Sequence, residues 1–245
     1  AAHQIGDGGV VLRAGHHRHE QPEAADLVHQ HALQRHRHAR QHLDVEGVGH
    51  AALAGEFPGE GQRVDVVAGG AGVQADLKSI AAAGGFGMAV VTALVAQNTQ
   101  GVRSVHTPPM SFLREQLDAV FDDVTVDAVK IGMLGDVETV AEVTRALESH
   151  RVAHVILDPV MVASSGDRLL NEDAEAAVRE LVRHVDVITP NLRELAVLCD
   201  AAVATTLDEG IEQARGLSSD TGTTVIVKGG HLTGPEADNA VVTPD

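Results

Sequence analysis

Acidic and basic side chains follow those apolar stretches of the chain that have the length of a strand. Asp158 follows one such stretch, Glu194 lies one helical turn after another, and Lys228 and Gly229 end a third. Carboxylates such as Asp158 and Glu194 can hold Mg²⁺, usually through water. A lysine offers a point charge to a phosphate, and glycine lets the backbone approach phosphate oxygens. Together these residues suit a site for a magnesium-nucleotide and a polar small molecule.

Each candidate also has a plain structural interpretation. Asp158 directly precedes a proline and can cap a turn, and Glu194 can be a solvated acid in a first helical turn. Lys228 can be a surface lysine. Gln97 suits the edge of a pyrimidine, but a glutamine at a strand end is more often a loop hydrogen bonder, and Met133 is more often core than ligand wall. Because polar residues recur at five successive strand ends, we favour a shared site over coincidence.

Strands and helices alternate along the part of the chain that carries these residues. Helical spacing of apolar residues predicts helices over 73–81, 112–121, 137–147, 174–182, 192–198 and 207–217. Continuous apolar runs predict strands over 88–96, 127–133, 154–160, 185–189 and 223–230. This alternation predicts an α/β fold with a mostly parallel sheet covered by helices on both sides. Ligands bind such sheets at the carboxyl ends of the strands, where the candidates fall.

Composition excludes several classes of function. The formal net charge is −17, so a duplex or an anionic membrane would repel the surface. Trp and Tyr are absent and Phe occurs four times, which removes the stacking platforms of single-strand binders. No apolar run is long enough to span a membrane, and we expect no membrane or nucleic-acid partner. The single cysteine, Cys199, cannot form an intramolecular disulfide and suits a cytoplasmic protein.

The first 63 residues have a different composition from the rest. Ten of the fifteen histidines lie there, and apolar residues show no sustained period. One interpretation is a metal-binding tract, although no ligand spacing closes a site. The other, which we favour, is that 1–63 is a His-rich leader that is disordered or non-native. Its Ala, Gly, His, Arg and Val content is also what out-of-frame translation of GC-rich DNA would give.

Five motifs give the rest of the chain a specific resemblance. They are GAGVQADLKSIAAAGGFGMAVVTALVAQNTQGV (70–102), KIGMLGD (130–136), ILDPVMVASSGDRLL (156–170), ITPNLRELAVL (188–198) and VIVKGGHL (225–232). In this order and spacing they resemble the hydroxymethylpyrimidine/phosphomethylpyrimidine kinases of thiamine biosynthesis, from about residue 69 to the end. The resemblance implies a three-layer α/β/α, ribokinase-like kinase domain over 64–245, incomplete at both ends. Related pyridoxal kinases share looser versions of the same motifs.

The resemblance also implies an activity. It is the transfer of phosphate from ATP, with Mg²⁺, to 4-amino-5-hydroxymethyl-2-methylpyrimidine and then to its monophosphate. The implied substrate-binding residues are Ala71, Gln97, Met133 and Val160. The implied ATP-binding residues are Thr189, Asn191, Lys228 and Gly229, and the implied metal-binding residues are Asp158 and Glu194. Such kinases are often homodimers, and we expect a cytoplasmic enzyme with a small-molecule substrate.

The chain departs from the family pattern at three places. A Gly-Thr-Asp turn is missing from VDVVAGGAG (64–72), and Ser164 stands where the family often has lysine. The Gly-Thr-Gly-Cys segment, which carries the proposed base, would lie beyond Asp245, so we expect no catalytic residue within the chain and very poor kinase activity. Two alternatives stay open: a pyridoxine or pyridoxal kinase of the same fold, and a truncated, non-catalytic relic.

Overall fold

The chain forms two compact units in a computed structural model. Unit 1 comprises Ala1–Ala39, His154–Pro159 and Glu175–Asp245, and unit 2 comprises Arg40–Ala153 and Val160–Ala174. The structure describes residues 2–5, 9–14, 41–46, 72–98, 101–161, 169–229 and 238–244. None of the helices in these ranges is both long and apolar enough to cross a membrane.

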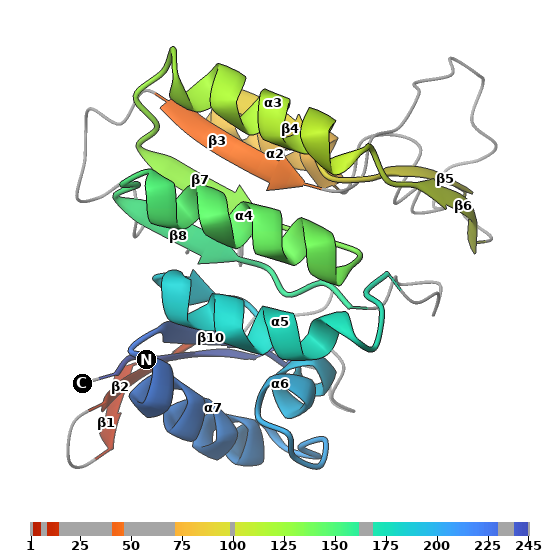
Figure 1. Ribbon diagram of the computed structural model, residues 1–245. Helices are drawn as coiled ribbons and strands as arrows, with labels where there is room; N and C mark the ends of the chain where they lie inside the picture. Colours follow the sequence, from red (N-terminus) through yellow and green to blue (C-terminus); the bar gives the residue numbers. More distant parts are fainter. Residues whose placement is uncertain are drawn as a thin grey trace, which may run out of the picture. The chain divides into compact units, whose positions relative to one another are not determined.

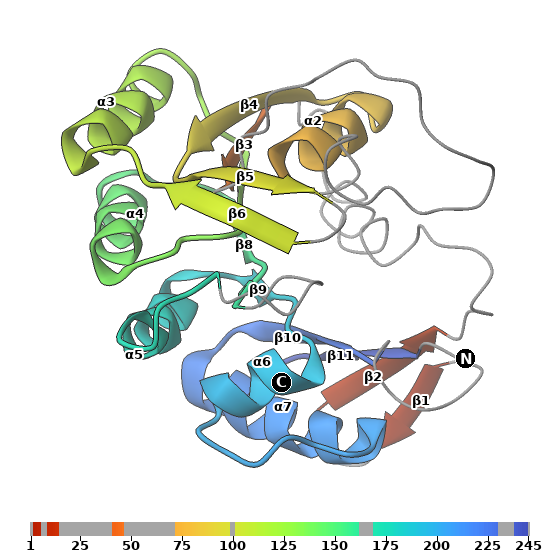
Figure 2. The same cartoon turned by 90° about the vertical axis from the view of Figure 1, so that its right-hand side faces the viewer.

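Unit 2 contains a parallel sheet with helices on both faces. Its strand order is β7 (Ala128–Ile131), β3 (Gln41–Glu46) and β4 (Phe86–Val91). Both pairings of β3 are parallel. Helix α2 (Gly72–Ala82) lies on one face, and α3 (Met110–Phe121) and α4 (Val137–Ser149) lie on the other (Figure 1, Figure 2). The predicted strand near 127–133 and helices near 73–81, 112–121 and 137–147 are therefore confirmed.

The helices of unit 2 form where apolar residues recur every three or four positions. Leu113 and Leu117 of α3 are buried, as are Val140 and Val143 of α4. Asp136 is the N-cap of helix α4, and its carboxylate accepts a hydrogen bond from the Thr139 backbone N–H at 2.8 Å. Such a cap satisfies a donor that the first helical turn leaves free. The core of the unit thus lies between the sheet and these helix faces.

The sequence predicts a single strand over the apolar run 88–96, and this prediction is wrong. It is divided between β4 and β5 (Leu94–Asn98), and β5 pairs antiparallel with β6 (Gly101–His106) in a separate two-stranded sheet. The break falls at Thr92, which is fully buried and bonds out of the strand to another segment. Because residues on both sides of the break are apolar, hydrophobicity alone gives no sign of it.

Unit 1 contains a mixed sheet. Its strand order is β1 (Ala2–Ile5), β2 (Gly9–Ala14), β11 (Asn239–Val242), β10 (Thr224–Lys228), β9 (Val187–Ile188) and β8 (His154–Leu157). Strands β8, β9 and β10 are parallel, and β11 is antiparallel to β10 and β2. The helical segments are α5 (Ala174–Leu181), the 3₁₀ turn Val182–His184, α6 (Leu192–Leu198) and α7 (Leu207–Thr221). Helix α7 packs on β10 and β11.

Three strands lie within residues 1–63, where we expected a disordered leader. β1 and β2 form a hairpin whose second strand pairs with β11, and β3 pairs with β4 and β7. Alternating or consecutive apolar residues such as Val10, Val11, Leu43 and Val45 can serve a strand even in a polar segment. The rest of 1–63 lies outside the described residues. Its disorder, and a domain boundary at residue 64, stay predictions.

Candidate functional site

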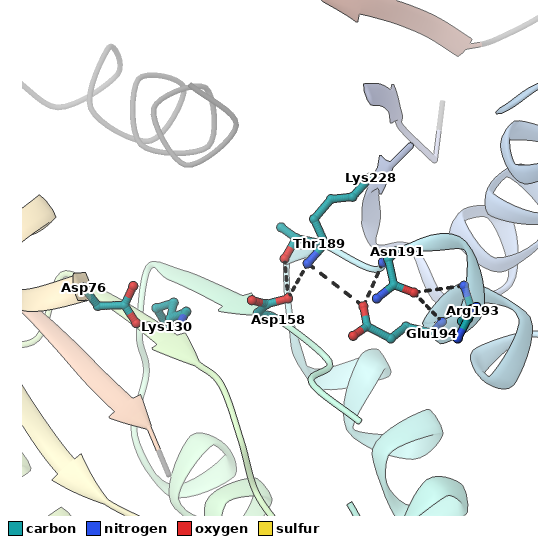
Figure 3. Close-up of polar contacts among 8 residues, drawn as sticks. All are labelled: Asp76, Lys130, Asp158, Thr189, Asn191, Arg193, Glu194 and Lys228. Atoms are coloured by element: carbon teal, nitrogen blue, oxygen red, sulfur yellow. Dashed lines mark hydrogen bonds and ion pairs between the residues drawn. The ribbon is translucent and has the colours of Figure 1, made fainter. Parts of the chain in front are cut away.

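Four polar side chains meet at the carboxyl ends of three parallel strands in unit 1. Asp158 follows β8, Thr189 follows β9, Glu194 lies on α6, and Lys228 ends β10. Figure 3 shows the ammonium of Lys228 directed at both carboxylates. Its Nζ donates to Asp158 Oδ1 at 2.9 Å and lies 4.0 Å from Glu194 Oε2. We call these four residues the Lys228 cluster.

Backbone hydrogen bonds beyond the strands hold the cluster together. The Thr189 N–H donates to the Leu157 carbonyl at 3.0 Å, and the Lys228 N–H donates to the Pro190 carbonyl at 2.9 Å. The hydroxyl of Thr189 then donates to Asp158 Oδ1 at 3.1 Å. The sheet pattern therefore extends past the assigned strand ends, and it brings together the residues that the sequence placed at separate ends.

Glu194 has a structural role in addition to its contact with Lys228. Asn191 is the N-cap of α6, and its Oδ1 accepts from the backbone N–H groups of Arg193 and Glu194 at 2.9 and 3.0 Å. Glu194 Oε2 accepts in return from the Asn191 N–H at 2.8 Å, which completes a capping box (Figure 3). The side chain of Glu194 is only 8% exposed. It is therefore a buried acid held in place by a helix cap, not a solvated one.

The charges of the Lys228 cluster leave room for a further cation. One ammonium faces two carboxylates, and the side chains of Lys228 and Asp158 are 34% and 28% exposed. In the described ranges, no group of three or more His, Cys, Asp or Glu residues could hold a metal ion by itself. A nucleotide-bound Mg²⁺ needs only one or two carboxylates, because water and phosphate complete its shell. The donor set of Asp158 and Glu194 fits that requirement.

Gly229 is required by a close approach of two backbone segments. Its N–H donates to the Asp238 carbonyl at 3.0 Å and to Asn239 Oδ1 at 3.3 Å. A Cβ at this position would clash with the Asp238 carbonyl oxygen, so no other residue fits without rearrangement. The Gly229 amide is thus engaged inside the protein, and a role in ATP binding stays a prediction.

The residues expected to bind substrate belong to unit 2 and are less completely described. Met133 is buried and packs with Ala93 and Val95, and Leu169 covers the group. Val160 is half-buried. Gln97 lies in β5 opposite Val102, but its side chain is outside the described part, as is all of Ala71. The structure therefore shows an apolar cluster around Met133, while contact of these residues with a pyrimidine stays a prediction.

A second charged cluster in unit 2 escaped the sequence analysis. Glu142 of α4 accepts hydrogen bonds from Arg114 of α3 at 3.0 and 2.7 Å, and from Arg145 of α4 at 2.9 and 2.5 Å. The hydrogen bonds from Arg114, followed by those from Arg145, lower the pKa of Glu142 to about 2. We call these three residues the Glu142 cluster. The spacing of Glu142 and Arg145 on one helix was the only signal in the sequence.

One further ion pair of unit 2 was also missed. Lys130 Nζ of β7 lies 2.5 Å from Asp76 Oδ2 of α2, and both side chains are about a quarter exposed (Figure 3). The pair ties α2 to the sheet. Its members lie in the motifs 70–102 and 130–136, where the sequence analysis had singled out other residues.

Comparison with known proteins finds sequence similarity over most of the described part of the chain. The family described as phosphomethylpyrimidine kinase matches residues 67–245. The hydroxymethylpyrimidine/phosphomethylpyrimidine kinase of Escherichia coli is 49% identical over 165 residues, which cover 67% of this chain and 62% of the relative. The thiamine biosynthesis multifunctional protein ThiED of Corynebacterium glutamicum is 66% identical over 177 residues, 72% of this chain and 23% of the relative. The chain thus spans less than two thirds of these relatives.

Solved structures agree with the sequence relatives. The phosphomethylpyrimidine kinase of Clostridium difficile superimposes with a TM-score of 0.71 at 32% identity, covering 84% of this chain and 81% of that one. An ADP complex of Bacillus subtilis pyridoxal kinase gives a TM-score of 0.70 at 27% identity, covering 84% and 73%. The predicted ribokinase-like α/β fold is confirmed. Fold, motifs and family match lead to one conclusion: the chain belongs to the phosphomethylpyrimidine kinase family.

Proposed function

We propose that this chain serves the ATP-dependent phosphorylation of 4-amino-5-hydroxymethyl-2-methylpyrimidine and of its monophosphate in thiamine diphosphate biosynthesis. The observation that carries the proposal is the family match over residues 67–245, which includes every member of the Lys228 cluster. Sequence relatives at 49% identity are named for the same two substrates.

The Lys228 cluster would provide positive charge for phosphoryl transfer through Lys228 itself and through Mg²⁺ held by its two acids. Negative charge spreads over the oxygens of the phosphoryl group in the transition state, so catalysis relies mainly on positioning and on positive charge. Asp158 and Glu194 would hold Mg²⁺, which neutralises charge on the nucleotide phosphates. Lys228 would turn its ammonium from Asp158 to a phosphate oxygen, and Thr189 and Asn191 would add polar contacts to the nucleotide.

The substrate residues are proposed on the family resemblance. Gln97 would read the polar edge of the pyrimidine with its amide, which both donates and accepts. Ala71, Met133 and Val160 would form the wall against the ring. The assignment of this wall rests on the resemblance, because the Met133 side chain is only 2% exposed and packs with Ala93 and Val95.

Pyridoxal kinase activity is the second candidate. The supporting observation is that the Bacillus subtilis pyridoxal kinase, solved with ADP, superimposes about as well as the phosphomethylpyrimidine kinase, with TM-scores of 0.70 and 0.71. Sequence identity favours the pyrimidine kinase, at 32% against 27% for these two structures.

The test compares the two pyrimidine substrates with pyridoxine. ADP release is followed with Mg²⁺-ATP and either the hydroxymethylpyrimidine, its monophosphate, pyridoxine or no substrate. In a chain completed with the family's Gly-Thr-Gly-Cys segment, we expect turnover on both pyrimidines of about 1 per second or faster, as is usual for kinases, and far slower turnover in the 245-residue chain alone. A higher kcat/KM for pyridoxine would select the second candidate. Titration of ADP into the 245-residue chain measures nucleotide binding independently of turnover.

A further inference from the structure

The end of β4 is held by a side chain from α3. The Val91 N–H donates to Gln116 Oε1 at 3.0 Å, and Gln116 Nε2 donates to the Val91 carbonyl at 3.2 Å. One carboxamide therefore satisfies both backbone groups of the last residue of the strand. Buried backbone groups need such partners, and here the partner does not come from another strand. Val91 is thus held by α3 in addition to its pairing with Glu46 of β3.

The next residue ties this point to the end of β7. Thr92 is fully buried, and its hydroxyl donates to the Met133 carbonyl at 2.7 Å. Thr92 follows β4 directly and Met133 lies two residues after β7, so the bond joins the exits of two strands of one sheet. Leaving a buried hydrogen-bonding group unpaired costs about 1–3 kcal/mol, so this contact constrains both segments.

The apolar cluster begins where this network ends. Ala93 follows Thr92, Val95 lies two positions further on, and Met133 is the hydrogen-bond acceptor itself. Strand β5 also starts at Leu94, so the direction in which the chain continues toward Gln97 is set at the same place. Two of the residues expected to contact the pyrimidine, Met133 and Gln97, thus lie on segments that the buried Thr92 hydroxyl helps to position.

We propose that Thr92, supported by Gln116, is a positioning residue that determines how tightly the pyrimidine is bound. The inference rests on the proposed function, in which Met133 and Gln97 contact the substrate. Loss of the Thr92 hydrogen bond frees the Met133 segment and the start of β5, which weakens binding of the pyrimidine. Because that loss affects ground state and transition state alike, the KM for the pyrimidine rises while kcat changes little. The proposed ATP residues belong to unit 1, so the KM for ATP stays constant.

A matched pair of substitutions at Thr92 tests the proposed positioning role. Thr92→Val keeps the shape and removes the hydroxyl, and Thr92→Ser keeps the hydroxyl. The control is Thr139→Val, because Thr139 is equally buried but its hydroxyl has no hydrogen-bond partner in the described part of the chain. For Thr92→Val we expect a KM for the pyrimidine about 10-fold higher, with kcat within about threefold and the KM for ATP unchanged. Thr92→Ser and Thr139→Val should behave like wild type.

The outcomes separate the inference from the function on which it rests. Wild-type enzyme without pyrimidine-dependent turnover would refute the proposed function. An active Thr92→Val enzyme with an unchanged pyrimidine KM, or with equal rises in both KM values, would refute the positioning role alone. If Thr92→Val fails to fold, Gln116→Met decides: we expect its pyrimidine KM to rise about threefold, and no rise would refute the inference.

Discussion

The Lys228 cluster and the Glu142 cluster are opposite arrangements of the same chemistry. In the first, one lysine of unit 1 faces two acids. In the second, one acid of unit 2 faces two arginines. The first lies at the carboxyl ends of strands, and the second joins α3 to α4. The acid at the centre of the second cluster uses both of its oxygens for hydrogen bonds to the arginines.

The comparison teaches that the place of a charged cluster in the fold, and not its residue types, carries the argument for the role we propose for it. The Lys228 cluster has an excess of negative charge at the edge of a sheet where ligands of this fold class bind. The Glu142 cluster has an excess of positive charge on a helix surface, and its arginine side chains are 52% and 43% exposed. Residue types alone would not distinguish a proposed binding site, such as the Lys228 cluster, from an ion-pair cluster that links two helices, such as the Glu142 cluster.

Substitution of Lys228, which faces both acids of its cluster, should have the largest effect. For Lys228→Met we expect a fall in kcat of about 100- to 1000-fold, the usual result of removing one group that stabilises transition-state charge. Free Mg²⁺ should bind more tightly, because the two carboxylates lose their internal cation. Steady-state kinetics and calorimetric titration measure the two effects.

The matched control for this substitution is Arg215→Met. Arg215 lies on α7 of the same unit, its side chain is also 34% exposed, and it pairs with Glu212. Removal of an exposed ion pair costs at most about 1 kcal/mol of stability and should leave kcat unchanged. Similar kinetics for the two variants would show that Lys228 is an ordinary surface lysine.

The second test separates the metal role of Glu194 from its capping role. Glu194→Gln keeps an oxygen that can accept from the Asn191 N–H, because glutamine also completes a capping box. We expect an unchanged unfolding midpoint and a Mg²⁺ concentration at half-maximal rate about 10-fold higher, from the loss of one ionic ligand. Glu209→Gln, which removes another first-turn acid of unit 1, is the control. An equal Mg²⁺ requirement in both variants would exclude Glu194 as a metal ligand.

The smallest expected effect concerns the Glu142 cluster. The pKa of Glu142 is about 2 in the folded chain, below the ordinary value of 4.5. Its ionised form is therefore favoured by folding, and the stabilisation is complete above pH 4.5 and is lost as the pH falls toward 2. Exposure of the arginines screens the interaction, so we expect Glu142→Gln to lower the free energy of unfolding by about 1 kcal/mol at pH 7 and less at pH 4. Urea unfolding at both pH values measures this.

The control for Glu142→Gln is Glu138→Gln, on the same helix. Glu138 is exposed, and its substitution should change stability by less than about 0.5 kcal/mol at either pH. Turnover should be unchanged in both variants. A loss of activity in Glu142→Gln without a loss of stability would overturn the distinction between the two clusters.

Strand ends carried most of the predictive information in the sequence. Asp158, Thr189, Asn191, Glu194 and Lys228 could be found because each follows an apolar run, and parallel strands bring such positions to one edge. Their hydrogen bonds confirm that they meet in unit 1. The capping role of Glu194, in addition to its contact with Lys228, could also have been predicted, because Asn191 and Glu194 have the spacing of a capping box.

Features that depend on long-range pairing could not be predicted. The break at Thr92 needs the Met133 carbonyl as a partner, 41 residues away. Strand β11 lies after a segment without periodicity, and it becomes a strand by pairing with β10. The bonds from Arg114 to Glu142 depend on how α3 and α4 pack. In each case the deciding contact joins residues with no local pattern between them.

The carboxamide of Gln116 also bears on how the protein avoids aggregation. Strand β4 ends the strand order of unit 2 in the described ranges, so it is an edge strand. Exposed edges can recruit strands from other molecules, and proteins cover them in several ways. Here Gln116 occupies both backbone groups of Val91, which closes that end of the edge to a foreign strand. Phe86, at the other end of β4, is 63% exposed, so that end of the edge strand presents an aromatic side chain to solvent.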